Sequence, residues 1–330
     1  MCILTGCIGI SGAVVFSAAS FASKTLSPIA ALAGHSIFAI GAESVYPLTT
    51  SLIAAHFSGK GGVLGITVIN SVAKLGTCVV YFLAPRISSP FIVTCLLGVV
   101  CFLAGIICMF FAKAPPSQAS LAGAKSPGKW FHSGKIVLLC LCFVFGATSL
   151  APLNCHLSNL LQESYSIKEP QANAIIWASV LLTIVTLPLS ALFIGRFNLS
   201  KPRVMMFCLC LLGISLALFR FTKANPAPLV LLMQCSYSVF SSCFWSVLGQ
   251  TLKTIEADKM CFICACTVSL YNLYSCAIAW ACSKWLITGG NCYDRLVSLL
   301  LCNVLCSILM LSGCLWKSKG AIDQAFQSKA

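Results

Sequence analysis

Residues 135–160 read KIVLLCLCFVFGATSLAPLNCHLSNL, and this stretch decides the fold. After Lys135 it contains no Asp, Glu, Lys or Arg. A helix needs about 20 consecutive apolar residues to cross a bilayer, so the stretch predicts a membrane span. Similar runs occupy 1–21, 27–57, 62–83, 90–113, 171–195, 203–222, 227–250, 261–288 and 295–316. The sequence therefore predicts an all-α polytopic membrane bundle of about ten transmembrane helices.

The composition of the whole 330-residue chain agrees with this prediction. The chain is 59% hydrophobic and 8% charged, with a mean hydropathy of +0.96. Soluble domains carry roughly 25% charged residues, so an ordinary cytosolic enzyme, a disordered protein and a nucleic-acid binder are excluded. In a membrane protein the net charge of +14 indicates basic cytosolic loops and no nucleic-acid partner. The expected partners are the lipid bilayer and a small-molecule substrate.

The prolines within these runs predict local irregularity. Pro152 and Pro188 fall inside predicted helices, where a missing N–H and a bulky ring disturb the hydrogen-bond ladder. Pro170 and Pro226 fall at predicted helix starts, where the missing N–H costs nothing. We therefore expect local kinks at Pro152 and Pro188.

Residues 114–134 form the longest connection and divide the chain. The segment is rich in Pro, Ser and Lys, which is typical of a flexible linker. It separates an incomplete N-terminal bundle of four helices (1–113) from a C-terminal bundle of six (135–316), which is followed by a tail (317–330). In this topology, 13 of the 21 basic residues fall in the segments on the side of the termini, seven lie opposite, and Lys74 lies inside a span. The positive-inside rule therefore places the linker, the tail and both termini in the cytosol.

The 22 cysteines lie almost entirely within apolar runs, where a free thiol packs as a small hydrophobic side chain. Their spacing does not match a zinc site. The chain also contains no HExxH or GxSxG motif. We therefore predict no metal site, no cofactor and no enzymatic activity.

Glu43 and Lys74 are the charged residues that stand out inside predicted spans. Glu43 lies 14 residues before Phe57, and Lys74 lies 12 residues after Gly62. At 1.5 Å per residue these depths are about 21 Å and about 18 Å from the same membrane face. Charges inside a membrane are costly and usually functional. The pair is either a structural ion pair or a site that binds a polar, zwitterionic substrate.

Two weaker candidates for a substrate site are Ser44, which lies next to Glu43, and His156, which lies on a later predicted helix. Ser44 belongs to the small-residue stretch Gly41–Ser44, which either packs closely against another helix or leaves room for a ligand. His156 lies toward the outer end of its predicted helix. It is either a packing residue or a substrate-binding or proton-carrying one.

In the second half, aromatic and amide side chains lie well inside two spans. Trp245 and Gln250 fall on one predicted helix, and Tyr271, Asn272 and Tyr274 fall on the next. Such groups line polar cavities, although Trp and Tyr also gather at lipid interfaces. We predict that Trp245, Tyr271 and Asn272 belong to a substrate cavity.

Residues 38–44 read FAIGAES, and residues 71–77 read SVAKLGT. These segments resemble the helix-four motif FGIGGES and the helix-five motif ARIGS of a lysosomal dipeptide transporter family, major facilitator superfamily domain-containing protein 1. Glu43 and Ser44 match the first motif, and Lys74 stands where the family has Arg. Residues 232–277 are similar to the family's helices ten and eleven. On this register Met1 falls at helix three, so two N-terminal helices and the acidic dileucine sorting signal are expected to be missing.

The resemblance implies a secondary transporter that exports dipeptides or similar zwitterions from the lysosome by alternating access, as a uniporter. Glu43 would bind the ammonium and Lys74 the carboxylate, while Trp245 and Asn272 would close the site from the second bundle. A homodimer and a glycosylated lysosomal accessory subunit are implied partners. Two alternatives stay open: a truncated membrane scaffold that does not transport, and a major facilitator carrier for a sugar or an organic anion.

Overall fold

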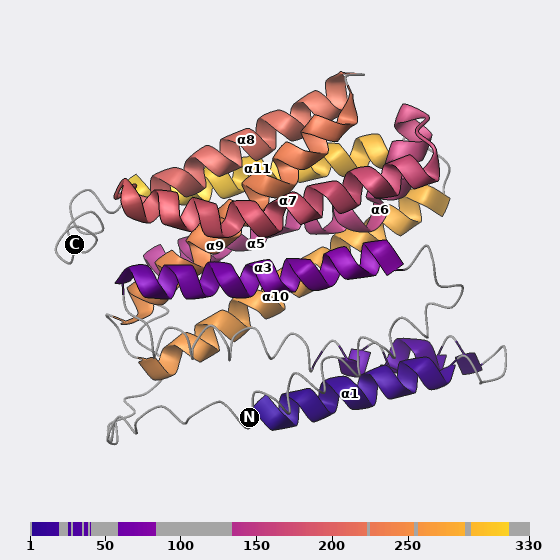
Figure 1. Ribbon diagram of the computed structural model, residues 1–330, viewed down its shortest axis with the longest axis horizontal. Coiled ribbons are helices and arrows are strands. Elements are labelled where there is room, and N and C mark those ends of the chain that lie inside the picture. The colour runs from indigo at the N-terminus through magenta and orange to yellow at the C-terminus, as the bar shows by residue number, and fades with distance from the viewer. Residues whose placement is uncertain are drawn as a thin grey trace. The chain divides into compact units, whose positions relative to one another are not determined.

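The computed structural model describes residues 2–19, 26–27, 29–34, 36–38, 40, 59–83, 134–222, 225–253, 257–287 and 292–316. Its helices are α1 (Cys2–Ala18), α3 (Gly59–Leu83), α5 (Gly134–Thr148), α6 (Ala151–Tyr165), α7 (Glu169–Arg196), α8 (Lys201–Phe221), α9 (Pro226–Lys253), α10 (Ala257–Ile287) and α11 (Cys292–Trp316) (Figure 1). The chain forms two compact units, Met1–His56 with Val79–Ala124, and Phe57–Cys78 with Lys125–Ala330. Most of α3 thus belongs to the second unit. The predicted boundaries of the linker and of the tail stay predictions.

Six helical segments among the described residues are long and apolar enough to cross a membrane. They are Gly134–Tyr165, Glu169–Arg196, Lys201–Phe221, Pro226–Leu248, Phe262–Trp285 and Tyr293–Leu315. They coincide with the six spans predicted within 135–316, which confirms the all-helical membrane fold. The described part of the chain contains no strand. The predicted total of ten stays a prediction. Within 1–21 and 62–83 the apolar helical segments are the shorter Cys7–Phe16 and Leu64–Gly76, and the spans 27–57 and 90–113 lie largely or wholly outside the described residues.

The first of these spans is interrupted near its middle, as expected from Pro152. Helix α5 ends at Thr148, and α6 begins at Ala151, with the proline in its first turn. Proline has no N–H to donate, and its ring collides with the carbonyl of the fourth residue before it, here Thr148. The irregularity predicted at Pro152 is therefore confirmed. Helix α7, in contrast, runs from Glu169 to Arg196 with Pro188 inside it.

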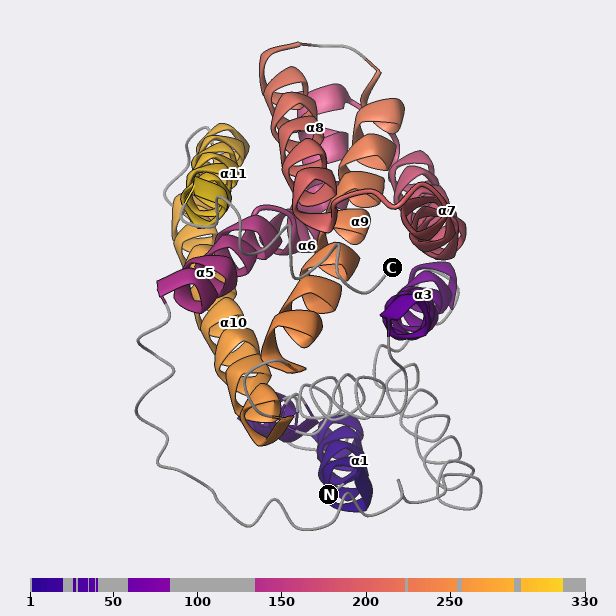
Figure 2. The ribbon, with the colours of Figure 1, turned by 90° about the vertical axis from the view of Figure 1, so that its left-hand side faces the viewer.

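Helix α9 lies at the centre of the packing in the second unit. It packs against α8 and α7, while α11 packs against α5 and α8 (Figure 2). Phe240 and Phe244 of α9 are fully buried in this core. Large apolar side chains such as Phe207, Leu189 and Leu309 stay exposed, as expected for surfaces that contact lipid. The interior of the bundle holds polar side chains as well, among them Gln234 and Asn303.

In the first unit, a pair of glycines brings two helical segments into close contact. A Cβ added at Gly12 would overlap the backbone of Phe38, and one added at Gly34 would overlap the backbone of Phe16. Because backbone atoms cannot yield as a flexible side chain can, only glycine fits at either position. Small residues at helix crossings are typical of membrane proteins.

Candidate functional site

Helix α3 contacts α9 through two polar pairs inside the second unit. The Lys74 Nζ lies 5.5 Å from the centroid of the Tyr237 ring. One turn earlier on α3, Asn70 donates a hydrogen bond from Nδ2 to the Ser242 Oγ, at 3.1 Å. Because the order along α3 is reversed along α9, the two helices run antiparallel here.

Lys74 carries its charge deep in the helix. It lies 15 residues after the first residue of α3, a distance of about 22 Å along the axis. The negative face of an aromatic ring attracts an ammonium, and a Lys–Tyr contact contributes about 0.5–2 kcal/mol. Arg220–Asp294 is the only ion pair among the described residues, so no carboxylate in that part of the chain pairs with Lys74. The contact that the described residues give to this ammonium is the one with the Tyr237 ring.

An aromatic cluster lies between α5, α9 and α10. The Phe143 ring stacks on Phe244 with centroids 4.2 Å apart, and the Trp245 ring lies edge-on to Phe143 at 5.0 Å. Tyr271 of α10 approaches the same phenylalanine at 6.0 Å. Phe143 thus joins Trp245 and Tyr271, two of the predicted site residues. The Trp245 side chain is 2% exposed, so it belongs to the core in this conformation.

A pair of amide side chains lies further along α9. Gln234, which is 2% exposed, donates a hydrogen bond from Nε2 to the Asn154 Oδ1 of α6, at 2.6 Å. Polar residues on facing helices form such bonds because hydrocarbon offers no alternative partner. Gln234 lies one helical turn from Tyr237, so the amide pair is close to the Lys74 contact along α9.

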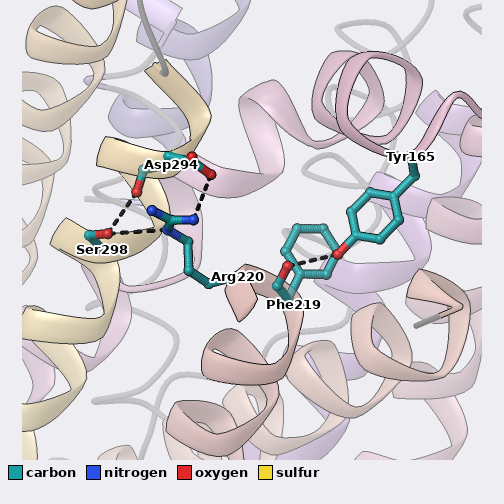
Figure 3. Close-up of polar contacts among 5 residues, drawn as sticks. All are labelled: Tyr165, Phe219, Arg220, Asp294 and Ser298. Carbon is teal, nitrogen blue, oxygen red and sulfur yellow. Dashed lines mark hydrogen bonds and ion pairs between the residues drawn. The ribbon is translucent and has the colours of Figure 1, made fainter. Parts of the chain in front are cut away.

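A charged group lies where the chain turns from α8 to α9 and where α11 begins. Arg220 forms an ion pair with Asp294 at 3.0 Å and donates from Nε to the Ser298 Oγ at 3.5 Å (Figure 3). Close by, the Tyr165 hydroxyl donates to the Phe219 carbonyl oxygen at 2.7 Å (Figure 3). The ion pair is partly exposed, with side-chain exposures of 27% and 46%. These contacts join the ends of helices and are structural.

The other predicted site residues are distributed more widely. Asn272 is half-buried on α10, and His156 is half-buried on α6. Glu43 and Ser44 lie outside the described residues, so the predicted pairing of Glu43 with Lys74 stays a prediction. Gln250 lies on α9. The assignment of all these residues to a substrate site likewise stays a prediction.

Sequence reasoning missed four residues that contribute polar contacts near Lys74: Asn70, Asn154, Gln234 and Ser242. An amide inside an apolar span is a signal that could have identified the first three, because polar groups in membrane helices usually face the protein interior. No comparable signal marks Ser242, since serine occurs at many positions of these spans. Among the described residues, no group of three or more His, Cys, Asp and Glu could hold a metal ion. Buried cysteines such as Cys142, Cys208 and Cys314 are free thiols.

The second unit defines this chain as an integral, multi-pass helical membrane protein. No family model matches the chain, and no curated protein matches it. Solved structures do match. The human organic anion transporter MFSD10 (TETRAN) superposes with a TM-score of 0.69 at 16% sequence identity, covering 93% of this chain and 76% of that chain.

Two further structures are similar over almost the whole chain. A bacterial homologue of the iron transporter ferroportin, in the outward-facing state, has a TM-score of 0.64 at 16% identity, with 96% of this chain and 84% of that chain covered. The major facilitator superfamily transporter FucP, in the outward conformation, has a TM-score of 0.64 at 13% identity, covering 97% of this chain and 83% of that chain. The chain therefore has the fold of major facilitator transporters.

Proposed function

We propose that this protein is a secondary carrier that moves a small zwitterionic solute, such as a dipeptide, across a membrane by alternating access. The observation that carries the proposal is the position of Lys74, deep inside α3 with its ammonium over the Tyr237 ring. A charge at this depth is costly, and such charges usually pair with another group or mark a substrate pathway. The fold, which this chain shares with solved carriers, supports transport as the activity.

The proposed mechanism uses binding energy and no chemical step. Lys74 binds the solute carboxylate, and Glu43 binds its ammonium. Trp245 and Asn272 contact the solute from the second bundle. Two bundles that rock around such a central site expose it to each side of the membrane in turn. The resemblance at residues 38–44 and 71–77 implies a uniporter of the lysosomal membrane, which carries the solute down its gradient. It also implies a homodimer and a glycosylated accessory subunit.

Uptake by proteoliposomes tests this proposal. Wild-type protein should take up radiolabelled alanyl-alanine but not its C-terminal amide, because the amide has no carboxylate for Lys74. Lys74→Met should lower uptake by at least about tenfold, since a hydrogen bond to a charged group contributes about 1.5–3 kcal/mol. Glu43→Gln should have a similar effect.

A matched control separates loss of binding from loss of an aromatic contact. Lys284 also lies over a ring, with its Nζ 5.8 Å from the centroid of Trp280, but it is exposed in the last turn of α10. Lys284→Met should leave uptake unchanged. Equal uptake by wild type and Lys74→Met would contradict the proposal.

A second candidate is a carrier for an organic anion or a sugar. It is favoured by the surroundings of Lys74, where the described residues contribute amides, hydroxyls and rings but no paired carboxylate. MFSD10 is an organic anion transporter, and the FucP of E. coli is a fucose:proton symporter. Uptake of lactate or fucose, without uptake of alanyl-alanine, would favour this candidate. A membrane scaffold that does not transport is the third candidate, and absence of uptake of all three solutes would favour it.

A further inference from the structure

Ser238 on α9 carries a buried hydroxyl that has no partner. Four other buried hydroxyls of this unit donate to a carbonyl one turn back in their own helix: those of Ser179, Thr183, Ser215 and Thr267. The Ser238 side chain is equally buried, at 3% exposure, but its Oγ makes no hydrogen bond. The one other such hydroxyl among the described residues is that of Ser275 on α10. Because native proteins pair nearly all buried polar groups, an unpaired one requires an explanation.

The position of Ser238 in its helix suggests why its hydroxyl is unpaired. Gln234, Ser238 and Ser242 follow one another at four-residue spacing, so they lie on one face of α9. Gln234 bonds to Asn154 of α6, and Ser242 accepts a bond from Asn70 of α3. The middle position of this row is therefore the one without a partner.

The same row lies beside the half-buried Lys74. Tyr237, the residue next to Ser238, carries the Lys74 ammonium over its ring. An ammonium has three donors and no acceptor, and a hydroxyl can donate one hydrogen bond more. A group with acceptor oxygens and negative charge, such as a carboxylate, would satisfy both. Charge-assisted hydrogen bonds to a carboxylate are also stronger than neutral ones.

We propose that Ser238 is a specificity residue whose hydroxyl donates a hydrogen bond to the solute carboxylate bound by Lys74. The proposal rests on the proposed carrier function and adds a residue to that site. The hydroxyl is covered in this conformation, so the side chains over it move aside when the solute enters. Lys74, with its long stem, can follow the carboxylate from the ring of Tyr237 toward Ser238.

Thermal unfolding of the purified full-length protein, with and without solute, tests this proposal. The probes are alanyl-alanine and lactate, which share a carboxylate but differ in the ammonium. Ser238→Ala should raise the Kd for a bound probe by about tenfold or more, since it removes a hydrogen bond to a charged group. The same variant should melt, without solute, at or above the wild-type temperature, because it removes an unpaired buried hydroxyl.

Ser215→Ala is the matched control. Ser215 is fully buried on α8, and its hydroxyl donates to the Leu211 carbonyl oxygen at 2.7 Å. This variant should melt at or below the wild-type temperature and keep the wild-type Kd for each probe. Ser238→Ala should thus weaken binding without lowering the melting temperature, whereas Ser215→Ala should leave binding unchanged without raising the melting temperature.

The outcomes separate the two proposals. Unchanged Kd in Ser238→Ala, or an equal loss in Ser215→Ala, would overturn the role of Ser238 and leave the carrier proposal standing. Binding of lactate but not of alanyl-alanine, weakened by Ser238→Ala, would overturn the dipeptide assignment and support Ser238 as a carboxylate-binding residue. Absence of binding of both probes to the wild type would overturn the role of Ser238.

Discussion

The Tyr274 hydroxyl on α10 donates a hydrogen bond of 2.8 Å to the Asn303 side-chain oxygen on α11. The amide nitrogen of Asn303 in turn donates to the Thr148 Oγ1, at 3.4 Å, at the last residue of α5. Both Asn303 and Thr148 are buried. One asparagine therefore joins three helices at the interruption between α5 and α6.

Replacing this asparagine should destabilise the bundle. Asn303→Leu removes both bonds, and interhelical hydrogen bonds in membranes contribute about 0.6–1.7 kcal/mol each. We expect a loss of about 1–3 kcal/mol in the free energy of unfolding, measured by titration with SDS in mixed micelles. Tyr274→Phe should lose less, and the double variant should lose less than the sum of the two, because both changes remove the same bond. Additive losses would contradict the network.

Gly146 on α5 should not tolerate a side chain. A Cβ at this position would lie 2.7 Å from two atoms of the Phe240 ring and 2.9 Å from the Ser307 Oγ. Because Phe240 is fully buried, the ring cannot move without disturbing the core, and Gly146→Ala should cost about 1–3 kcal/mol. Gly313→Ala is the control, since its Cβ would approach no closer than 3.9 Å to Leu138. Equal melting temperatures for the two variants would contradict the predicted overlap.

Gly34, in the glycine contact of the first unit, should not tolerate a side chain either. Gly34→Ala would place a methyl group against the backbone of Phe16, so we expect loss of folded protein on size-exclusion chromatography after expression in membranes. Gly76 offers a control from α3, because a Cβ there meets nothing within 4 Å. Gly76→Ala should fold at least as well as the wild type, since alanine favours a helix by roughly 1 kcal/mol over glycine. A normal elution profile for Gly34→Ala would show that the two segments do not cross at this point.

The ion pair at the ends of α8 and α11 should contribute little. Arg220 and Asp294 are partly exposed, and exposed pairs contribute at most about 1 kcal/mol. Asp294→Asn should therefore lower the melting temperature only slightly, and the difference from the wild type should shrink in high salt. Tyr165→Phe, which removes the bond to the Phe219 carbonyl oxygen, should be insensitive to salt. A large, salt-independent effect of Asp294→Asn would show that the pair is better shielded than its exposure indicates.

The site illustrates what hydropathy cannot reveal. Lys74 was identifiable as a charge inside an apolar run, but its partner Tyr237 was not. The meeting of Trp245 with Phe143, and of Asn70 with Ser242, likewise depends on which faces of the helices come together. In a soluble helix the apolar stripe marks the buried face, whereas a membrane helix is apolar toward both lipid and protein, so its periodicity is weak.

The six spans between Gly134 and Trp316 followed from the amino-acid sequence alone. In hydrocarbon every backbone N–H and C=O must be paired, and an α-helix pairs them within its own segment, so an apolar run of about 20 residues favours a helix. The interruption at Pro152 followed for a similarly local reason, because proline lacks the donor that the ladder needs. The tertiary structure alone decided that Gln234 reaches Asn154, that Asn303 joins three helices, and that Ser238 is left without a partner. These pairings come from close packing between helices far apart in the chain, and no local pattern of side chains specifies them.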